Sequence, residues 1–179
     1  MDYVDMYKTL GQFGHDLLSH KSLDEGLPKI ASYAKITIGA DRCSVYIYDE
    51  EKERLWTTLA DNIDKIEMSS KNGIAGLAVQ EAKAVIENKP YEDPHFDPSV
   101  DARTGYKTRN LAVAPIFNSK NRVIGVIQML NKLNGDFNAD DLKFLVFFAH
   151  FISGFLELAI LRHKHMVENG KESDISRHL

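Results

Sequence analysis

The segment that decides the fold is residues 96–132, which read FDPSVDARTGYKTRNLAVAPIFNSKNRVIGVIQMLNK. Its first part is rich in hydroxyl and charged side chains, so it cannot build a hydrophobic core. Residues 110–117 and 123–130 form two apolar runs around a polar turn at residues 118–121, which predicts a hairpin of central strands covered on both faces. A polar segment beside such strands is typical of a lid over a pocket.

Gln128 is the exception within the second apolar run. With a period of two it shares a face with Ile124, Val126 and Leu130, so its amide must find a hydrogen-bond partner inside a central strand. A backbone group or a water molecule is one candidate partner, and a ligand is the other. The residues alone leave both open.

Apolar spacing predicts two helices at the start of the chain. Residues 2–19 carry apolar side chains at intervals of three and four, the period of an amphipathic helix. Ser22 and Glu25 form a capping-box pattern that begins a second helix, and Gly39 ends it. The apolar positions are Tyr3, Met6, Tyr7, Leu10, Phe13 and Leu17 in the first helix and Leu23, Leu27, Ile30, Ala34 and Ile38 in the second.

The period then changes to two, which indicates strands. Residues 42–48 are predicted to form a strand with two unlike faces, with Cys43 on one and Ser44 on the other. Residues 55–59 are expected to pair back onto it as a hairpin. Residues 63–68 are expected to add a weaker, more exposed strand.

Gly73 and Gly76 flank the start of a short helix that is predicted to run to about residue 82. The N–H groups at such a start are unpaired and partially positive, so they suit an anion. The same pattern is also typical of a glycine-rich turn that merely leads into a helix. Residues 84–87 are expected to form a short strand, and residues 88–98, with three of the five prolines, no regular structure.

The last predicted element is a long helix that begins after Asn138 and runs to about His165. It carries two apolar stripes, and a helix of roughly 28 residues, about 42 Å long, exceeds what one sheet can cover. The second stripe is therefore expected to contact another helix, either the one over residues 2–19 or the same helices of a second copy. The first stripe comprises Leu142, Leu145, Ala149, Ile152, Leu156 and Ala159, and the second Phe144, Phe148, Phe151, Phe155 and Leu158.

These elements predict an α+β fold with a central, mostly antiparallel sheet of five or six strands flanked by helices on both faces. We expect residues 1–21 to form an N-terminal helix for dimerisation or signalling. Residues 22–165 are expected to form one domain that includes the long last helix. Residues 166–179 are polar without a period and are expected to be a frayed tail.

Composition and charge limit the function classes. The chain has 179 residues, of which 44% are hydrophobic and 27% charged, and fits one globular domain. A net charge of −4 without any Lys/Arg run argues against a nucleic-acid partner. No apolar run approaches the roughly 20 residues that span a bilayer, and the N-terminus has no signal-peptide pattern, so we expect a cytoplasmic protein.

The residues also argue against catalysis by this segment. Cys43 is the only cysteine, so the chain can form no intrachain disulfide and run no internal thiol–disulfide cycle. The seven histidines do not form a metal-ligand pattern. Neither a Ser-His-Asp order nor a phosphate-loop motif is present, and we expect no catalytic residues, no metal and no required cofactor.

Several ordered motifs carry a family resemblance. They are RCSV at residues 42–45, GIAG at 73–76, TGYKTRN at 104–110, VIGV at 123–126, and Asn131-Lys132 followed by Phe137 and Asp141. In this order, over residues 40–160, they resemble a GAF domain, a PAS-related sandwich. The similarity is greatest to the regulatory cyclic-nucleotide-binding GAF modules of phosphodiesterases and adenylyl cyclases.

The resemblance implies a set of site residues. A ligand would be held by Ser44, Ala60, Asp61, Ile74, Ala75, Asp101, Thr104, Thr108 and Gln128. Of these, Ile74 and Ala75 would supply N–H groups to a phosphate, and the two threonines, one helical turn apart by spacing, would offer two hydroxyls on one side. Gln128 offers both a donor and an acceptor to a purine edge.

The resemblance also implies structural residues, namely Asn131, Lys132, Phe137 and Asp141. In the family the Lys and Asp form an ion pair that ties the last strand to the last helix. Leu142 stands here in place of the final Glu of that signature.

The resemblance therefore implies a regulatory sensor that binds a small molecule, a purine cyclic nucleotide (cAMP or cGMP), and signals through its terminal helices as a homodimer. The alternative is a dimerisation and signal-transduction module whose pocket is empty or holds a different small ligand. In either case the segment would be non-catalytic and would regulate a catalytic output domain.

Overall fold

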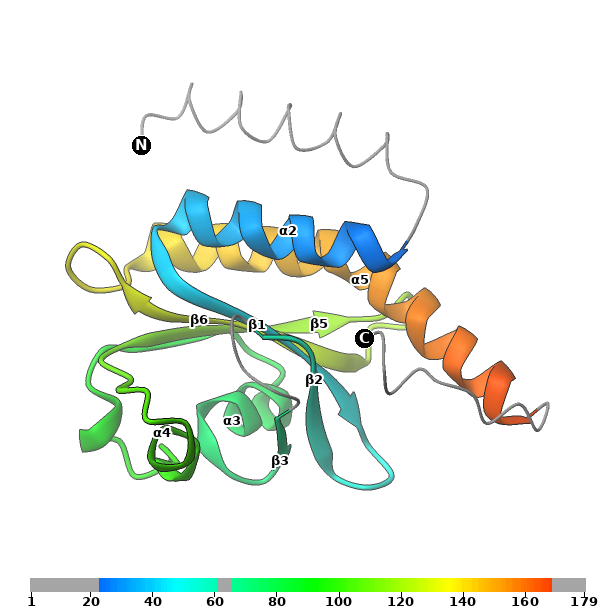
Figure 1. The fold of residues 1–179 in the computed structure, drawn as a ribbon, viewed down its shortest axis with the longest axis horizontal. Coiled ribbons are helices and arrows are strands. Elements are labelled where there is room, and N and C mark those ends of the chain that lie inside the picture. Colours follow the sequence, from blue (N-terminus) through cyan, green and yellow to red (C-terminus); the bar gives the residue numbers. More distant parts are fainter. Residues whose placement is uncertain (1–22, 61–65, 169–179) are drawn as a thin grey trace.

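A six-stranded antiparallel sheet forms the centre of the molecule (Figure 1). The computed structural model describes residues 23–60 and 66–168. The strands lie in the order β3-β2-β1-β6-β5-β4, so the two longest strands, β1 and β6, pair at the middle. Their bounds are Ala40–Asp49 (β1), Arg54–Ala60 (β2), Glu67–Ser69 (β3), Val85–Glu87 (β4), Leu111–Phe117 (β5) and Val123–Lys132 (β6).

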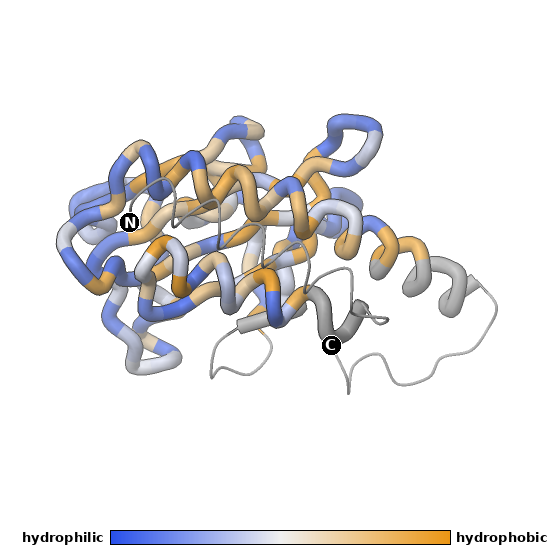
Figure 2. The backbone as a smooth tube through the Cα atoms, turned by 90° about the horizontal axis from the view of Figure 1, so that it is seen from above, coloured by the Kyte–Doolittle hydropathy of each residue, from blue (hydrophilic) through white to orange (hydrophobic). Residues whose placement is uncertain are grey.

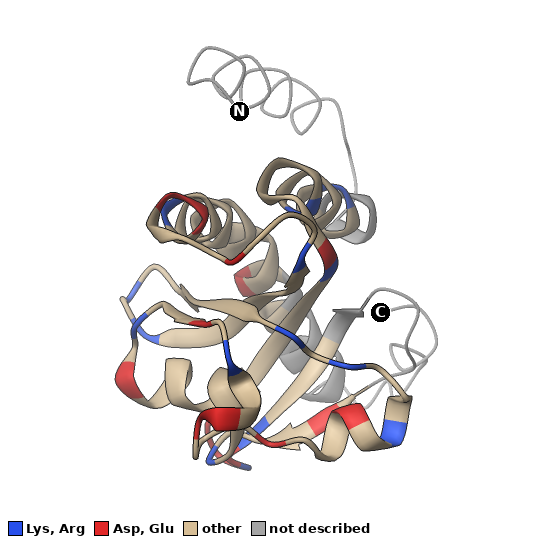
Figure 3. Cartoon of the chain, turned by 90° about the vertical axis from the view of Figure 1, so that its left-hand side faces the viewer, with Lys and Arg blue, Asp and Glu red and all other residues tan. Residues whose placement is uncertain are grey.

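Helices cover both faces of this sheet. The long helices α2 (Leu23–Ile38) and α5 (Ala139–Glu168) pack against each other and against one face, and Figure 2 shows this layer from above. The short helices α3 (Gly73–Glu81) and α4 (Ser99–Thr104) lie on the opposite face with the 3-10 helix η1 (Pro90–Glu92). Figure 3 shows charged residues on the long helices as well as in this second layer.

The predicted α+β architecture is confirmed, with small differences. Residues 90–92 form a 3-10 turn where no regular structure was expected, because Pro90 presets the backbone of its first position. Strand β3 begins at Glu67, and residues 63–65 of the predicted strand lie outside the described part. Residues 166–168 belong to α5 and not to a tail. The predicted helix over residues 2–19 and its neighbour Ser22 also lie outside the described residues.

The sheet separates two hydrophobic clusters, and β1 contributes to both. Cys43, Val45 and Ile47 pack with α2 and α5, whereas Tyr46 packs toward α3. Because side chains alternate along a strand, Ser44 shares the α3 side with Tyr46. Cys43 is only 2% exposed and sits among the apolar residues beneath the long helices.

The apolar stripes of α5 are placed almost as predicted. Leu145, Ala149, Ile152 and Leu156 of the first stripe are buried. Phe148, expected on the other stripe, is buried with them, because position 148 precedes Ala149 on the same inward arc. Helix α2 packs alongside α5, a contact that the sequence did not predict, and the expected partner helix over residues 2–19 lies outside the described residues. Leu158 and Leu161 remain 53% and 49% exposed.

Gly125 sets how closely α5 approaches the sheet. A β-carbon there would clash with the Tyr46 carbonyl oxygen and lie 2.8 Å from Cδ2 of Leu156. Gly125→Ala is therefore expected to lower the free energy of unfolding by about 2 kcal/mol, measured by urea denaturation. The control is Gly154→Ala on α5, where an added β-carbon meets nothing within 4 Å. That change should be neutral or stabilise by up to about 1 kcal/mol, and equal effects of the two would contradict this assignment.

Candidate functional site

The floor of the candidate site is a row of residues that runs across the sheet. Ser44 pairs with Gln128, and Gln128 pairs with Val113 on its other side. Directly opposed residues in antiparallel strands place their side chains on the same face. Ala60 pairs with Ser44 through the backbone of β2. The row therefore brings together residues far apart in the sequence on the face that α3 and the lid cover.

A cavity lies above this floor, and we name it the inner cavity. Its walls come from the sheet, from the start of α3 and from the lid, which we define as residues 96–109. Seven of the nine expected ligand residues line it: Ser44, Ile74, Ala75, Asp101, Thr104, Thr108 and Gln128. Ala60 is not among the lining residues, and Asp61 lies outside the described part of the chain.

The inner cavity is small, at about 70 Å³. Pockets that hold drug-sized ligands have volumes of roughly 300–1,000 Å³. Apolar and aromatic side chains, including Tyr46, Phe96 and Leu130, take part in its lining. In this conformation the hollow therefore accommodates a few waters and not a nucleotide.

Helix α3 presents its N-terminus to the cavity. Asn72 is the N-cap, but its side chain makes no capping hydrogen bond. The first N–H groups of a helix, here those of Gly73, Ile74 and Ala75, have no partner within the helix. Gly76 fixes the position of this end, because a β-carbon there would lie 2.6 Å from the Ser70 carbonyl oxygen. The arrangement can donate N–H groups to an acceptor inside the cavity.

The lid is held closed around Asp101. Its carboxylate accepts hydrogen bonds from the Thr108 N–H (2.7 Å), the Thr108 hydroxyl (2.8 Å) and the Tyr91 hydroxyl (2.8 Å). Both Asp101 and Thr108 are buried. The bond to Asp101 raises the pKa of the Tyr91 hydroxyl above its ordinary value. In this conformation the hydrogen-bonding groups of Asp101 and Thr108 are thus paired with each other and not directed at a ligand.

The expectation that Thr104 and Thr108 lie one helical turn apart is wrong. Helix α4 ends at Thr104, because Gly105 adopts a left-handed conformation with φ of 70°. The Thr104 hydroxyl donates to the Val100 carbonyl at 2.8 Å, while the Thr108 hydroxyl donates to Asp101 from the extended segment that follows. Both residues line the cavity, but from two different backbone segments.

Tyr106 is a lid residue that the sequence did not single out. Its hydroxyl donates to Asp41 at 2.7 Å, and the Arg42 guanidinium lies 3.8 Å from its ring centroid. Burial and the bond to Asp41 raise the pKa of Tyr106 far above its ordinary value. These contacts join the lid to the first residues of β1, next to the end of α2. Their partners are 65 positions apart, so no local pattern signals them.

Tyr46 is a second cavity residue that the sequence reasoning missed, although its place two residues after Ser44 could have indicated it. Burial is the main cause that raises the pKa of Tyr46 to about 12, partly offset by a hydrogen bond with Ser44. The phenol is 3% exposed at the base of the cavity. It is therefore neutral at any physiological pH.

The pKa of Tyr46 predicts a stability change at alkaline pH. Between pH 10 and 12 the unfolded phenol ionises while the folded one keeps its proton, so stability is intact below pH 10 and falls as the pH rises through this window. Two pKa units correspond to about 2–3 kcal/mol. Tyr46→Phe should flatten this decline, measured by urea denaturation from pH 9 to 11.5. An unchanged slope would contradict the burial of the phenol.

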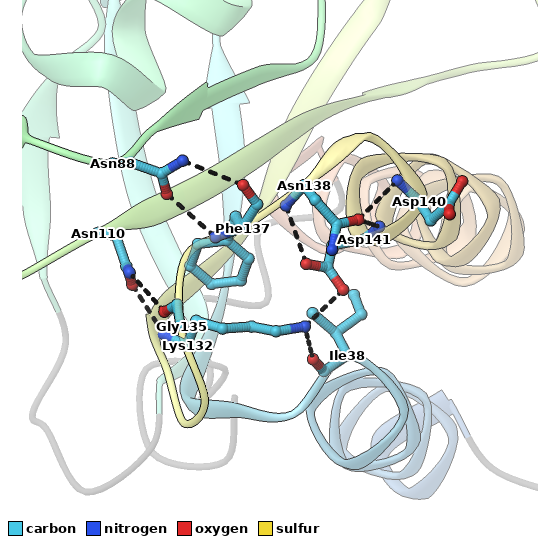
Figure 4. A network of polar contacts seen from close by, with 9 residues as sticks. All are labelled: Ile38, Asn88, Asn110, Lys132, Gly135, Phe137, Asn138, Asp140 and Asp141. Atoms are coloured by element: carbon cyan, nitrogen blue, oxygen red, sulfur yellow. Dashed lines mark hydrogen bonds and ion pairs between the residues drawn. The ribbon is translucent and has the colours of Figure 1, made fainter.

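A polar network below the lid ties β6 to both long helices (Figure 4). Lys132 Nζ lies 2.5 Å from Asp141 Oδ1 and donates at 2.5 Å to the carbonyl of Ile38, the last residue of α2. The Lys132 and Asp141 side chains are 14% and 10% exposed. The other Asp141 oxygen accepts from the Asn138 N–H at the start of α5. Lys132 therefore lies where β6, α2 and α5 meet.

Two asparagines extend this network, Asn131 to the lid and Asn88 to the segment before α5. Asn131 accepts from the Arg109 N–H at 2.7 Å and donates to the Lys107 carbonyl at 2.9 Å. Asn88 donates to the carbonyl of the buried Phe137 and accepts from its N–H. The C-terminal part of the lid is thus attached directly to the end of β6.

The sequence model of the GAF domain family matches residues 22–156. The chain belongs to the GAF domain family. The GAF domain is a regulatory sensor domain of signal transduction. The prediction that this chain is a regulatory sensor module is therefore confirmed.

Two relatives are 3',5'-cyclic phosphodiesterases. A probable cyclic phosphodiesterase (pde-5) of Caenorhabditis elegans is 28% identical over 141 residues, which cover 71% of this chain and 19% of that protein. A dual cyclic-AMP and -GMP phosphodiesterase 11A of Takifugu rubripes is 30% identical over 166 residues, which cover 84% of this chain and 18% of that protein. The GAF domain spans less than a fifth of the length of either relative.

Solved structures share the fold at low identity. The GAF domain of a phosphoenolpyruvate-protein phosphotransferase from Coxiella burnetii has a TM-score of 0.77 at 16% identity and covers 92% of this chain and 99% of that chain. A free methionine-R-sulfoxide reductase from Neisseria meningitidis, in complex with its substrate, has a TM-score of 0.73 at 18% identity and covers 90% and 95%. The same fold thus occurs in a domain of a phosphotransferase and in a free methionine-R-sulfoxide reductase, so the fold alone does not decide the chemistry.

The described residues carry neither a membrane-spanning helix nor a metal-ligand cluster. None of their helices combines the length and the apolar character needed to cross a membrane. Within the same residues, no group of three or more His, Cys, Asp and Glu side chains is arranged to hold a metal ion.

Proposed function

We propose that this GAF domain is a small-molecule sensor that binds a purine cyclic nucleotide in the inner cavity and signals through α2 and α5. The observation that carries the proposal is the convergence of Ser44, Gln128, the start of α3 and the lid on one cavity. The phosphodiesterase relatives support the choice of ligand class. By the same analogy, the module regulates a catalytic output domain and is itself non-catalytic.

The chemistry of the lining suits each part of such a ligand. The Gln128 amide offers a donor and an acceptor to a purine edge, and Ser44 offers a hydroxyl beside it. The described lining residues include no Lys or Arg, but they include Asp97 and Asp101. A cyclic phosphate would therefore depend on the N–H groups of Ile74 and Ala75 at the start of α3.

A nucleotide requires the lid to move outward, because the present cavity of about 70 Å³ is too small. The lid is held by Asp101, which binds Thr108 and Tyr91, and by Tyr106, which binds Asp41. Outward movement would break or rearrange these contacts. The ligand must therefore supply enough binding free energy to replace them.

The same contacts connect the lid to the long helices α2 and α5, through which ligand binding would be signalled. Tyr106 holds the start of β1, directly after α2, and Asn131 holds the lid beside Lys132. Lys132 in turn contacts the last residue of α2 and the first turn of α5. Lid movement would thus act on both long helices, through which we propose that two copies of the domain associate.

A second candidate function is a signalling and dimerisation module whose cavity stays empty or holds a smaller ligand. The small volume of the inner cavity favours it, and so do the exposed Leu158 and Leu161 on α5. Cys43 lies on the opposite face of the sheet from the cavity, so it cannot act on a molecule bound there.

Calorimetry of the ligand-free protein with cyclic AMP and cyclic GMP tests the proposal. We expect saturable heat with one of them, and Gln128→Leu should weaken its binding by roughly tenfold or more, because the amide hydrogen bonds are lost. Ser44→Ala should weaken it less. Ser32→Ala, at an exposed position on α2, is the matched control and should bind like the parent. No heat from either nucleotide at a hundred-micromolar scale, with the protein folded, would favour the second candidate.

A further inference from the structure

A second, larger hollow adjoins the inner cavity. It has a volume of about 460 Å³ and lies between α3 and residues 94–98, and we name it the outer groove. The inner cavity and the outer groove share four lining residues, Asn72, Gly73, Phe96 and Asp97. These residues form the wall between a hollow too small for a nucleotide and one within the range of ligand pockets.

This wall is thin. Gly73 has φ of 75°, and the β-carbon of Asp97 lies 3.9 Å from where a β-carbon of Gly73 would be. Asp97 is held in place because its Oδ1 accepts the Ser99 N–H at 2.9 Å, at the start of α4. The wall thus joins the start of α3, at Asn72 and Gly73, to Phe96 and Asp97 of the opposite segment.

Two residues of the wall, Phe96 and Asp97, belong to the lid and are connected to the rest of it. The ring of Phe96 lies 5.0 Å from that of Tyr91, whose hydroxyl donates to Asp101. Asp97 leads directly into α4, which carries Asp101. Displacement of the lid would therefore displace Phe96 and Asp97 with it and connect the two hollows.

The charges along this path are predominantly negative. Asp97 faces both hollows and Asp101 faces the inner one. On the groove side Lys71 is 2.5 Å from Glu53, and His95 is 2.9 Å from Asp93. An anion that passes Asp97 thus meets a carboxylate whose charge Lys71, which is engaged by Glu53, does not cancel.

We propose that the outer groove is the entrance to the inner cavity, that Phe96 is its steric gate, and that Asp97 sets which charge passes. A cationic or neutral molecule passes more readily than an anion, and an anionic ligand needs Asp97 to move aside. The proposal rests on the proposed function only in treating the inner cavity as the ligand site. It does not depend on the ligand being a cyclic nucleotide.

Chemical labelling of Ser44→Cys tests this without any ligand. The introduced thiol lies in the inner cavity, and its reaction rates with neutral, cationic and anionic methanethiosulfonates report access. We expect the cationic reagent to react roughly tenfold faster than the anionic one, as one nearby charge in a largely aqueous passage implies. Adding Asp97→Asn, which keeps an acceptor for Ser99, should lower this ratio toward one, with each rate taken relative to that of the same reagent with a free thiol. Adding Phe96→Ala should accelerate all three reagents and preserve the ratio.

Three comparisons make the test decisive. The parent chain, with Cys43 alone, gives the background rate, and Asp49→Asn removes a charge from a distant turn where the Asp49 carboxylate likewise accepts a backbone N–H. Asp49→Asn should leave the ratio unchanged. If Ser44→Cys does not fold, Gln128→Cys places the thiol on the same floor. Rates that neither Phe96→Ala nor Asp97→Asn alters would overturn the proposal.

The outcome is separable from that of the proposed function. A charge-selective labelling rate together with no nucleotide heat would support the proposed entrance and contradict the binding of a cyclic nucleotide. Nucleotide heat together with labelling rates that neither Phe96→Ala nor Asp97→Asn changes would support nucleotide binding and contradict the proposed entrance.

Discussion

Lys132→Met is expected to lower the free energy of unfolding by about 3–5 kcal/mol, because it leaves the buried Asp141 carboxylate without its counter-charge. The variant also removes the bond to the Ile38 carbonyl, so the end of α2 loses its attachment to β6. Urea denaturation at neutral pH measures the change. The loss should be cooperative, since the same residue holds β6, α2 and α5 together (Figure 4).

Two comparisons separate the buried pair from charge in general. Lys52→Met removes an equivalent partner of Asp49, but the Lys52 side chain is 76% exposed, so it should change stability by no more than about 0.5 kcal/mol. The double variant Lys132→Met/Asp141→Leu removes both charges and should recover much of the loss. A single variant as stable as the parent would mean that this pair does not organise the fold.

Asp101→Ala is expected to cost about 3 kcal/mol and to open the lid. It leaves the buried N–H and hydroxyl of Thr108 without an acceptor, and each such group costs about 1–3 kcal/mol. Hydrogen exchange should show this directly, because the Thr108 N–H is protected by the carboxylate in the parent. We expect its exchange to accelerate by at least an order of magnitude.

The conservative change Asp101→Asn retains one acceptor and should lose less stability and less protection. Asp49→Ala, at the last residue of β1, should leave exchange at Thr108 unaltered. If Asp101→Ala loosens α5 as much as the lid, the carboxylate serves the whole fold and is not specific to lid closure.

The sheet and helix layers of this molecule could be predicted because the spacing of apolar residues indicates which face of a strand or helix is buried. The alternation from Cys43 to Tyr46 predicted a strand with two unlike faces, and the structure places Cys43 and Val45 under α2 and α5 and Tyr46 toward α3. The apolar runs around residues 118–121 likewise identified the central hairpin of β5 and β6.

The lid could not be predicted in the same way. Its conformation depends on side-chain pairs between distant segments, such as Tyr106 with Asp41 and Tyr91 with Asp101. Spacing alone placed Thr104 and Thr108 on one helix, but Gly105 ends that helix between them. The volume of the cavity depends on how such side chains fill it, which a pattern of residue types does not specify.

The central claim is that a ligand binds between the Ser44–Gln128 row, the start of α3 and the lid. Nuclear magnetic resonance of the labelled protein during titration with cyclic AMP and cyclic GMP tests it most directly. We predict that one nucleotide shifts the amide signals of Ile74 and Ala75 and the side-chain NH₂ of Gln128, together with those of the lid. No shifts at saturating concentration, or shifts confined to residues outside this cavity, would contradict the account.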